Sequence, residues 1–444
     1  MNGSFGYVSG RPGSPIDEAR FSPHAVTSAD GRFTIVFEGD VETPESVLAA
    51  YAARGKRAIE ELRGGFALGL WDTTDRTLVL ARDPIGIKSL YFATAPGKLA
   101  FASEVWTLAA GGFAEKRLSR RAVASFLATG AVAEPDTILE GVSPLPPATI
   151  LTYRDGHARS ATYWELPIEP RMPHAAAPFE AALAEAVGPG TNAPLAPDER
   201  EITEAIEALD QPSTSFLPTF RAAKSARETA FTDLGRNALF PATADRILRF
   251  SALLAAERSV ERAYTKLRST TPPDELAAFV SPDIADAALL PVTIPEKLEP
   301  SLARHALHPA RALATLDLAN DLRDAALRDA DVASRRLGFT FRAPLLDRAV
   351  VEHALSLRLM SKFRLTWARR APAPPLAAWL QGPLRAWAER LLLDEARTRA
   401  PFLDAPALAQ RWRRFLTDER GLGAPCLFAL TTLIAYLQNH DATL

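Results

Sequence analysis

Few side chains in this sequence have the type and spacing that chemistry requires. Cys426 is the only thiol in the chain. It lies in the apolar run 425–437, a pattern that predicts a helix with a buried core cysteine rather than a reactive one. His305 and His308 form the only close pair of histidines. Because no cysteine or carboxylate accompanies them, we expect a surface or packing role for both.

Common catalytic and nucleotide-binding motifs are also missing from the sequence. The chain has no Ser-His-Asp order, no HExxH pattern and no P-loop. The stretch 188–192, GPGTN, is rich in glycine, but no strand precedes it. It is therefore typical of a turn rather than of a phosphate-binding loop.

Length, composition and charge indicate a globular protein of two or three domains. The 444 residues are 47% hydrophobic, which is enough for packed cores. A formal net charge of -2 offers no strong field to nucleic acid or to an anionic membrane, so we expect neither as a partner. The first residues do not resemble a secretory signal, and a single cysteine cannot form an internal disulfide. We therefore expect a cytoplasmic protein, with the composition of a GC-rich bacterial genome.

The elements that would position a site begin with a predicted antiparallel meander. Short apolar runs alternate with turn residues between Arg63 and Glu104, which is typical of strands joined by tight turns. Upstream, an alternating strand begins at Phe33, and apolar spacing predicts a helix from Pro44 to Leu62. We expect residues 1–165 to form an α+β sandwich of antiparallel sheets.

The second half of the chain is predicted to be mostly helical. Residues 166–180 are rich in proline and form the expected linker to a second domain at 181–444. Apolar residues at three- and four-residue spacing predict helices in this domain. The predicted helices are 179–187, 198–209, 218–228, 244–266, 309–326, 349–357, 376–395 and 425–437.

The order of residues in the meander closely resembles the class II glutaminase domain of asparagine synthetases. That family has an RG-x-FA-x-x-LWD strand, an ARD-x-x-GIK-x-LYYA hairpin and an FASE strand; this chain has RGGFALGLWD from Arg63, ARDPIGIKSLYFA from Ala81 and FASE from Phe101. The segments 209–220, 341–355 and 379–393 resemble landmarks of the family's synthetase domain. The resemblance implies an N-terminal-nucleophile-like domain followed by an ATP-pyrophosphatase-type α/β domain.

Positions that the resemblance assigns to glutamine hydrolysis have changed. A class II glutaminase needs a cysteine at its mature N-terminus, activated by the free α-amine. Asn2 occupies this position, and a carboxamide cannot form a thioester. Glu38 and Gly39 stand where the family has its oxyanion-hole Asn-Gly, so a carboxylate replaces the amide. Thr43 replaces the aspartate that holds the substrate ammonium group.

The implied synthetase centre has changed as well. The phosphate-binding SGG-x-DS loop is absent, and the segment in which it should lie is too short to hold it. Gly235 is retained from the family's magnesium-binding frame, but its Asp-Glu pair corresponds to Asn237 and Ala238. The sequence therefore predicts that metal affinity is largely lost.

Three charged residues remain near the implied ATP site. Asp210 and Asp233 are isolated carboxylates, for which we expect solvated or helix-capping roles. The resemblance implies the family's catalytic lysine within 368–375, where Arg369 or its neighbour Arg370 keeps the charge but cannot donate a proton as lysine does. Because the missing segment supplies central parallel strands in the family, we expect a truncated α/β domain in which 229–232 is a strand with few neighbours.

These losses predict a homologue that is inactive in both centres. We expect it to act as a scaffold or regulator, bound to an active paralogue, to another biosynthetic enzyme or to a second copy of itself, with no cofactor. One alternative is an ATP-dependent amide-forming ligase that uses ammonia or an amine, which would need ATP and Mg²⁺. Glutamine-dependent asparagine synthesis is a further alternative.

Overall fold

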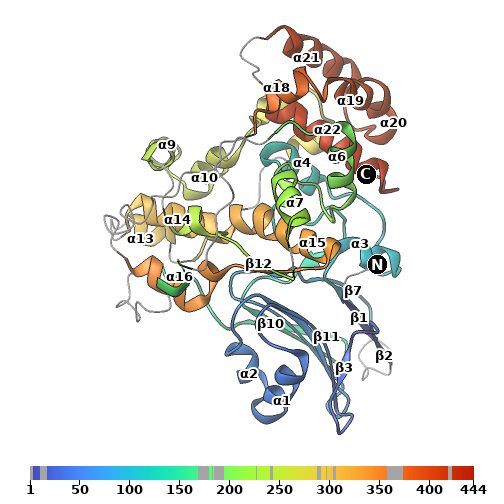
Figure 1. The fold of residues 1–444 in the computed structure, drawn as a ribbon, viewed down its shortest axis with the longest axis vertical. Coiled ribbons are helices and arrows are strands. Elements are labelled where there is room, and N and C mark those ends of the chain that lie inside the picture. The colour runs from blue at the N-terminus through green and yellow to red at the C-terminus, as the bar shows by residue number, and fades with distance from the viewer. Residues whose placement is uncertain are drawn as a thin grey trace.

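A computed structural model describes most of the chain in two differently built halves. It describes residues 4–10, 18–168, 180–182, 184, 195–226, 228–240, 244–287, 292–296, 298–303, 307–357, 374–418 and 423–444. Residues 4–168 contain two antiparallel sheets, and the residues from 180 onward are mainly helical (Figure 1). The predicted order, an antiparallel α+β sandwich followed by a helix-rich region, is confirmed. Asn2, Arg369, His305 and most of the predicted helix 179–187 lie outside the described residues.

The first half stacks its two sheets face to face. Its strands are β1 (Phe5–Ser9), β2 (Glu18–Phe21), β3 (Val26–Thr27), β4 (Phe33–Gly39), β5 (Phe66–Asp72), β6 (Thr77–Arg82), β7 (Tyr91–Ala95), β8 (Lys98–Ala102), β9 (Ser143–Pro144), β10 (Thr149–Arg154) and β11 (His157–Thr162). The sheet orders are β2-β1-β8-β7-β9 and β11-β10-β6-β5-β4-β3. Phe101 of one sheet and Trp71 of the other belong to a single buried cluster between them.

The predicted meander forms, and its chain passes from one sheet to the other. Strands β5 and β6 pair in the six-stranded sheet, whereas β7 and β8 pair in the five-stranded sheet. All seven residues of β5 are buried. This follows because Ala67 faces the second sheet while Leu68 faces helices on the outer side, so both faces of the strand are covered.

Two helices cover the outer face of the six-stranded sheet. They are α1 (Pro44–Arg54) and α2 (Lys56–Glu60), and Val47 and Ile59 pack on that face. The prediction of one continuous helix over 44–62 was wrong. Gly55 separates the two helices with a φ of 60°, a conformation that glycine adopts without the steric penalty of a side chain.

The remaining helices of the first half are α3 (Val105–Ala110) and α4 (Arg120–Thr129). The second half contains α6 (Glu199–Glu207), α7 (Phe216–Lys224), α8 (Arg236–Leu239), α9 (Ala244–Glu257), α10 (Val260–Arg268), α11 (Pro273–Leu276), α12 (Pro282–Asp286), α13 (Leu298–Ala303), α14 (Pro309–Ala319), α15 (Arg328–Leu337), α16 (Arg348–Ser356), α18 (Leu376–Gln381), α19 (Arg385–Glu389), α20 (Ala396–Arg399), α21 (Ala405–Thr417) and α22 (Ala424–Gln438), with the π-helices η1 (Leu322–Leu327) and η3 (Arg390–Glu395) and the 3-10 helix η2 (Pro344–Leu346). Most of the predicted helical ranges are therefore helical, but several are divided.

Two of the predicted long helices are interrupted in the structure. The range 244–266 forms α9 and α10, which are separated at Arg258, a residue with a φ of 52°. The range 376–395 forms α18, α19 and η3, with Gly382 ending α18. Apolar spacing continues across both interruptions, so periodicity alone could not reveal them.

The parallel sheet of the second half is reduced to two strands, β12 (Thr229–Phe231) and β13 (Thr340–Arg342). Among the described residues no further strand pairs with either of them. The expectation that the 229–232 strand has few neighbours is confirmed, and the region is helical where the family has a larger sheet.

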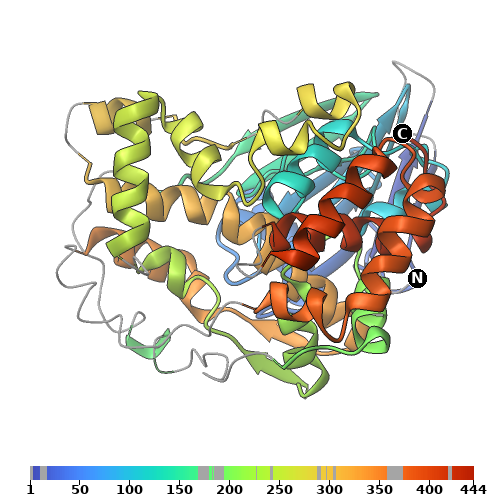
Figure 2. The same ribbon diagram turned by 90° about the horizontal axis from the view of Figure 1, so that it is seen from above.

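The two halves share one hydrophobic core. Tyr91 of the five-stranded sheet, Phe126 of α4, Trp387 of α19 and Leu433 of α22 belong to the same buried cluster. Helix α22 packs against α4, and Figure 2 shows the C-terminal helices beside α4. Among the described helices, none is both long and apolar enough to cross a membrane.

Candidate functional site

The turn between β6 and β7 is wound around one buried carboxylate. Asp83 accepts hydrogen bonds from the backbone N–H groups of Ile85, Gly86, Ile87 and Lys88 at 3.0, 2.8, 3.0 and 2.9 Å. Four converging donors fix the turn. The side chain of Lys88 is thereby held, buried, against the second half of the molecule.

Helix α15 meets this turn with a buried aspartate and arginine. Oδ1 of Asp331 lies 3.2 Å from Nζ of Lys88, and its Oδ2 accepts the N–H of Ser89 at 2.9 Å. Arg335, one helical turn along, pairs with the same carboxylate. Burial by itself raises the pKa of Asp331, but Arg335 and Lys88 outweigh burial and lower it to about 2. The carboxylate therefore stays ionised between the two halves.

Glu38 joins this group of charges from the end of β4. Nη1 of Arg335 lies 3.4 Å from Oε2 of Glu38, whose Oε1 accepts the N–H of Ser4 at 3.2 Å. Glu104 lies 3.5 Å from Nε of Arg335 and 3.0 Å from Nη2 of Arg336. The set is termed the interface charge cluster and consists of Glu38, Lys88, Glu104, Asp331, Arg335 and Arg336. The cluster contains three acidic and three basic side chains, so their formal charges cancel.

The other glutamine-site positions have local structural roles. A Cβ built on Gly39 would lie 2.4 Å from the ring of Phe37, so a larger residue would have to displace that ring. Asp40 accepts a backbone N–H at 2.8 Å, and burial raises its pKa to about 6. Thr43 caps α1: its Oγ1 accepts the N–H of Ser46 at 3.3 Å, and the Ser46 hydroxyl accepts the N–H of Thr43 at 3.3 Å.

A cavity of about 340 Å³ lies beside the positions that the sequence assigns to the synthetase centre. Asn237 and Ala238, which correspond to the family's Asp-Glu pair, both line it, together with Thr214 and Ser215. Gly235 precedes α8 with a φ of 90°, and a Cβ there would lie 2.3 Å from Leu346. Backbone conformation and this close approach explain why glycine is kept although the acidic pair is gone.

Arginine–aspartate pairs form the charged wall of this cavity. Nη2 of Arg246 lies 2.9 Å from Oδ1 of Asp317, which also accepts the hydroxyl of Tyr264 at 2.8 Å. Burial raises the pKa of Asp317 to about 6 even though Arg246 opposes it. Nη2 of Arg268 lies 2.7 Å from Oδ2 of Asp324. The arginine–aspartate cluster is defined as Arg246, Arg268, Asp317, Asp321 and Asp324.

These pairs do not fit a magnesium site. Mg²⁺ prefers carboxylate and water oxygens in an octahedral arrangement. Asp317 and Asp324 are already neutralised by Arg246 and Arg268, so an incoming cation would have to displace an arginine. In the part of the chain that the structure describes, no group of three His, Cys, Asp or Glu residues could hold a metal ion.

The two remaining charged candidates that the structure describes, Asp210 and Asp233, have separate partners. Asp210 caps α3, because its Oδ1 accepts the N–H of Val105 at 2.9 Å. Burial, with Glu104 nearby, raises the pKa of Asp210 to about 7. Asp233 pairs with Arg236 at 3.3 Å, one helical turn along. Arg369 lies outside the described residues, and so does Asn2.

Cys426 and His308 behave as the sequence indicates. Cys426 is 3% exposed on α22 and belongs to the shared core, which confirms the prediction of a buried cysteine. His308 caps α14, because its Nδ1 accepts the N–H of Ala310 at 3.1 Å. Neither residue lines the 340 Å³ cavity or belongs to the interface charge cluster.

Sequence patterns missed the arginines that occupy both centres. Arg335 lies 297 residues from Glu38 in the chain, so no local spacing connects them. One signal was available: acidic and basic residues recur at four-residue spacing in α15, as at Asp331 and Arg335, and this is typical of paired charges on a helix.

Family models match both halves of the chain. The model described as a glutamine amidotransferase domain matches residues 32–164. The model described as asparagine synthase matches residues 177–371. Together the two ranges cover most of the sequence.

The chain belongs to the asparagine synthetase family. This asparagine synthetase homologue is 38% identical over 133 residues to a putative asparagine synthetase [glutamine-hydrolyzing] of Mycobacterium tuberculosis, a match that covers 29% of this chain and 19% of that relative. It is 33% identical over 135 residues to asparagine synthetase [glutamine-hydrolyzing] 1 of Bacillus subtilis, covering 30% and 21%. It is also 33% identical over 131 residues to amidase chyE of Penicillium rubens, covering 29% and 19%. The chain therefore spans about a fifth of the length of these relatives.

Solved structures give weak matches to this asparagine synthetase homologue. One is glutamine phosphoribosylpyrophosphate amidotransferase from B. subtilis, with a TM-score of 0.24 and 13% identity, covering 47% of this chain and 52% of that one. The other is described as the allosteric regulatory enzyme of purine biosynthesis, with a TM-score of 0.25 and 10% identity, covering 51% and 54%.

Proposed function

We propose that this asparagine synthetase homologue is inactive in both family centres and acts by binding a protein partner. The observation that carries the proposal is the ion pair between Glu38 and Arg335. An oxyanion hole needs donors aimed at the developing negative charge, and an ionised carboxylate is only an acceptor. Glu38 is also held by a cation from the opposite half of the molecule, so it cannot simply turn away to make room for a substrate.

The thiol chemistry of a glutaminase has no candidate among the described residues. Burial raises the pKa of Cys426 to about 12, so the side chain remains a thiol at neutral pH. The thiolate is the nucleophilic form. Cys426 also lies in the core between helices rather than beside Glu38. The proposal therefore excludes Cys426 as a relocated nucleophile.

The second centre supports the same proposal. Asn237 and Ala238 offer no carboxylate to a metal ion, and the two aspartates that line the same cavity, Asp317 and Asp321, both lie within ion-pair distance of Arg246. Phosphate transfer of the ATP-dependent type relies on metal ions that neutralise the developing charge. Without a carboxylate set for that metal, binding without turnover is the function that this cavity supports.

The proposed partner is an enzyme of carbon–nitrogen bond metabolism, because the relatives are named as asparagine synthetases and amidases. It is an active paralogue, another biosynthetic enzyme or a second copy of this chain. The proposal includes a cytoplasmic location and no bound cofactor.

The test measures catalysis and ligand binding on the purified chain. We expect no ammonia from glutamine, no pyrophosphate release with carboxylate and amine substrates, and no rise in Tm with millimolar Mg-ATP. A ligand at a hundred times its Kd would add about 2.7 kcal/mol to the free energy of unfolding, which would move the Tm by several degrees. An active asparagine synthetase serves as the positive control. A clear Tm shift together with pyrophosphate release would contradict the proposal and favour the ATP-dependent amide ligase.

A further inference from the structure

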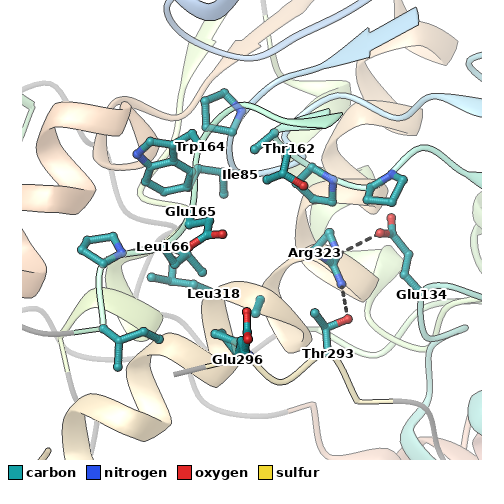
Figure 3. A pocket seen from close by; sticks show the side chains of 18 of the residues that line it. Ile85, Glu134, Thr162, Trp164, Glu165, Leu166, Thr293, Glu296, Leu318 and Arg323 are labelled. Atoms are coloured by element: carbon teal, nitrogen blue, oxygen red, sulfur yellow. Dashed lines mark hydrogen bonds and ion pairs between the residues drawn. The ribbon is translucent and has the colours of Figure 1, made fainter. Parts of the chain in front are cut away.

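A second cavity lies between the two halves and is separate from the 340 Å³ cavity and from the interface charge cluster (Figure 3). Its volume is about 630 Å³, within the range of roughly 300–1,000 Å³ that is usual for small-molecule sites. It is termed the interdomain cavity. Its walls come from the turn after β6, the segments that flank β10 and β11, the residues before α13, the end of α14 and the π-helix η1. It shares no lining residue with the 340 Å³ cavity.

Much of the lining of the interdomain cavity is rigid and apolar. Seven prolines from several segments line the cavity, and their rings restrict the backbone, so these parts of the lining are formed before any ligand arrives. Trp164 is fixed by a hydrogen bond from its Nε1 to Oε1 of Glu352 at 2.7 Å. Ile85 and Leu318 complete the apolar surface beside Trp164 (Figure 3). Such a lining suits an apolar or aromatic group.

A buried cation lies at the other side of the cavity. Arg323 is 6% exposed and sits in η1, a type of helix that is frequent at functional sites. Its Nη2 donates to Oγ1 of Thr293 at 3.4 Å, and its Nε lies 3.0 Å from Oε2 of Glu134. The Nε hydrogen nevertheless has no well-oriented acceptor among the described residues. The Glu134 carboxylate therefore holds Nε by an ion pair rather than by a well-aligned hydrogen bond.

Arg323 shares the carboxylates near it with other arginines. Glu134 is shared by two arginines, because Nη1 of Arg82 also donates to its Oε1 at 2.9 Å. Asp324 lies 3.9 Å from Nε of Arg323, but its shorter contact, 2.7 Å, is with Arg268. Arg323 therefore has only part of a carboxylate to itself. A ligand carboxylate or phosphate would complete its pairing.

Two carboxylates bring negative charge into the same cavity. Glu165 follows Trp164, Glu296 precedes α13, and both are exposed. Figure 3 shows their carboxylates directed into the cavity. Neither forms an ion pair with any residue that the structure describes. A ligand ammonium group would find two acceptors here without displacing an existing cation.

We propose that the interdomain cavity binds a small zwitterion with an apolar body, an apolar dipeptide being the class that fits it. The ligand's carboxylate pairs with Arg323, and its ammonium group lies between Glu165 and Glu296. The ligand's side chains pack on Trp164 and on the prolines that line the cavity. The site uses no residue of the glutamine or ATP centres, so it stands or falls independently of the proposed loss of catalysis.

Calorimetric titration of the full chain with phenylalanyl-leucine tests the charge requirement. The N-acetyl derivative lacks the cation, and the C-terminal amide lacks the anion. We expect saturable binding of the dipeptide, with each derivative binding about tenfold more weakly, the loss of one charge-assisted contact. Equal affinity for all three compounds, or no saturable binding of the dipeptide, would overturn the proposal.

Variants at the rim connect the binding to this cavity. The double variant E165Q/E296Q changes only exposed side chains, so it should fold. We expect it to bind the dipeptide about tenfold more weakly but to bind the N-acetyl derivative as the unmodified chain does. E207Q, at an exposed position of α6, is the matched control and should leave both affinities unchanged.

R323K should keep the preference for a free carboxylate, and R323M should lose it. If R323M fails to fold, the rim variants decide, and unchanged dipeptide affinity in E165Q/E296Q contradicts the proposal.

Discussion

The interface charge cluster and the arginine–aspartate cluster are both built from paired charges, but they lie in different surroundings. The first is packed between the two halves, and none of its members lines the cavities described above. The second still surrounds a cavity of about 340 Å³. Their aspartates differ accordingly: the pKa of Asp331 is lowered to about 2, whereas that of Asp317 is raised to about 6. The interface charge cluster therefore lies outside both cavities, whereas the arginine–aspartate cluster borders one of them.

Removing the central cation of the interface charge cluster should have the largest effect. The substitution Arg335→Met leaves Glu38, Glu104 and Asp331 short of a partner, and breaking a buried pair in this way costs about 3–5 kcal/mol. Urea unfolding measures the loss. Arg120→Met is the control, because its pair with Asp283 is exposed and should contribute less than about 1 kcal/mol. Similar losses for both variants would show that the cluster does not join the halves.

The corresponding change in the arginine–aspartate cluster should be milder. Arg246→Met leaves Asp317 with the hydroxyl of Tyr264 as its remaining partner. We expect a loss of about 1–3 kcal/mol, because the adjoining cavity lets water reach the carboxylate. Unfolding at pH 7 measures this loss. A loss as large as that of Arg335→Met would mean that water reaches the carboxylates of the two clusters to the same small extent.

Acidification should change the contribution to the free energy of unfolding in opposite directions for the two aspartates, Asp317 and Asp331. Asp317 has a raised pKa, so the folded state holds its proton more tightly, and this group favours folding as the pH falls from about 6 toward 4. Asp331 has a lowered pKa, so its stabilisation is complete above about 4 and is lost as the pH falls toward 2. Each group changes the slope of stability against pH by at most about 1.4 kcal/mol per pH unit.

Unfolding of Asp317→Asn and Asp331→Asn at pH 2 to 8 checks this difference. Asp317→Asn should remove a gain on acidification between pH 6 and 4. Asp331→Asn should remove a loss below pH 4. Identical changes of slope in the two variants would contradict the opposite shifts of the two pKa values.

The smallest expected effect concerns a glutamine-site position that has become structural. Thr43→Ala removes the cap of α1 and should lower the free energy of unfolding by about 1 kcal/mol. Thr43→Ser keeps the hydroxyl and should restore most of it. Circular dichroism during denaturant unfolding measures both variants. No difference between alanine and serine would mean that the hydroxyl does not stabilise the helix.

The sequence predicted the strands more successfully than the sites. The meander from β5 to β8 was predictable because turn residues separate its apolar runs, and both signals are local. The breaks at Gly55 and Arg258 were missed because apolar spacing continues through them. The substitution at Glu38 was visible in the sequence, but its partner was not. Arg335 reaches it only through tertiary packing, which no local pattern encodes.

The core shared by α4 and α22 has a consequence for synthesis of the chain. Helix α4 ends at Thr129, and α22, the last of the helices that pack against it, begins roughly 300 residues later. At a translation rate of about 5–20 residues per second, its apolar surface waits roughly 15–60 s on the ribosome for its partner. During that interval Phe126 and its buried neighbours lack part of their final cover. Slow elongation or premature termination would therefore prolong the exposure of this apolar surface, and aggregation competes with folding under such conditions.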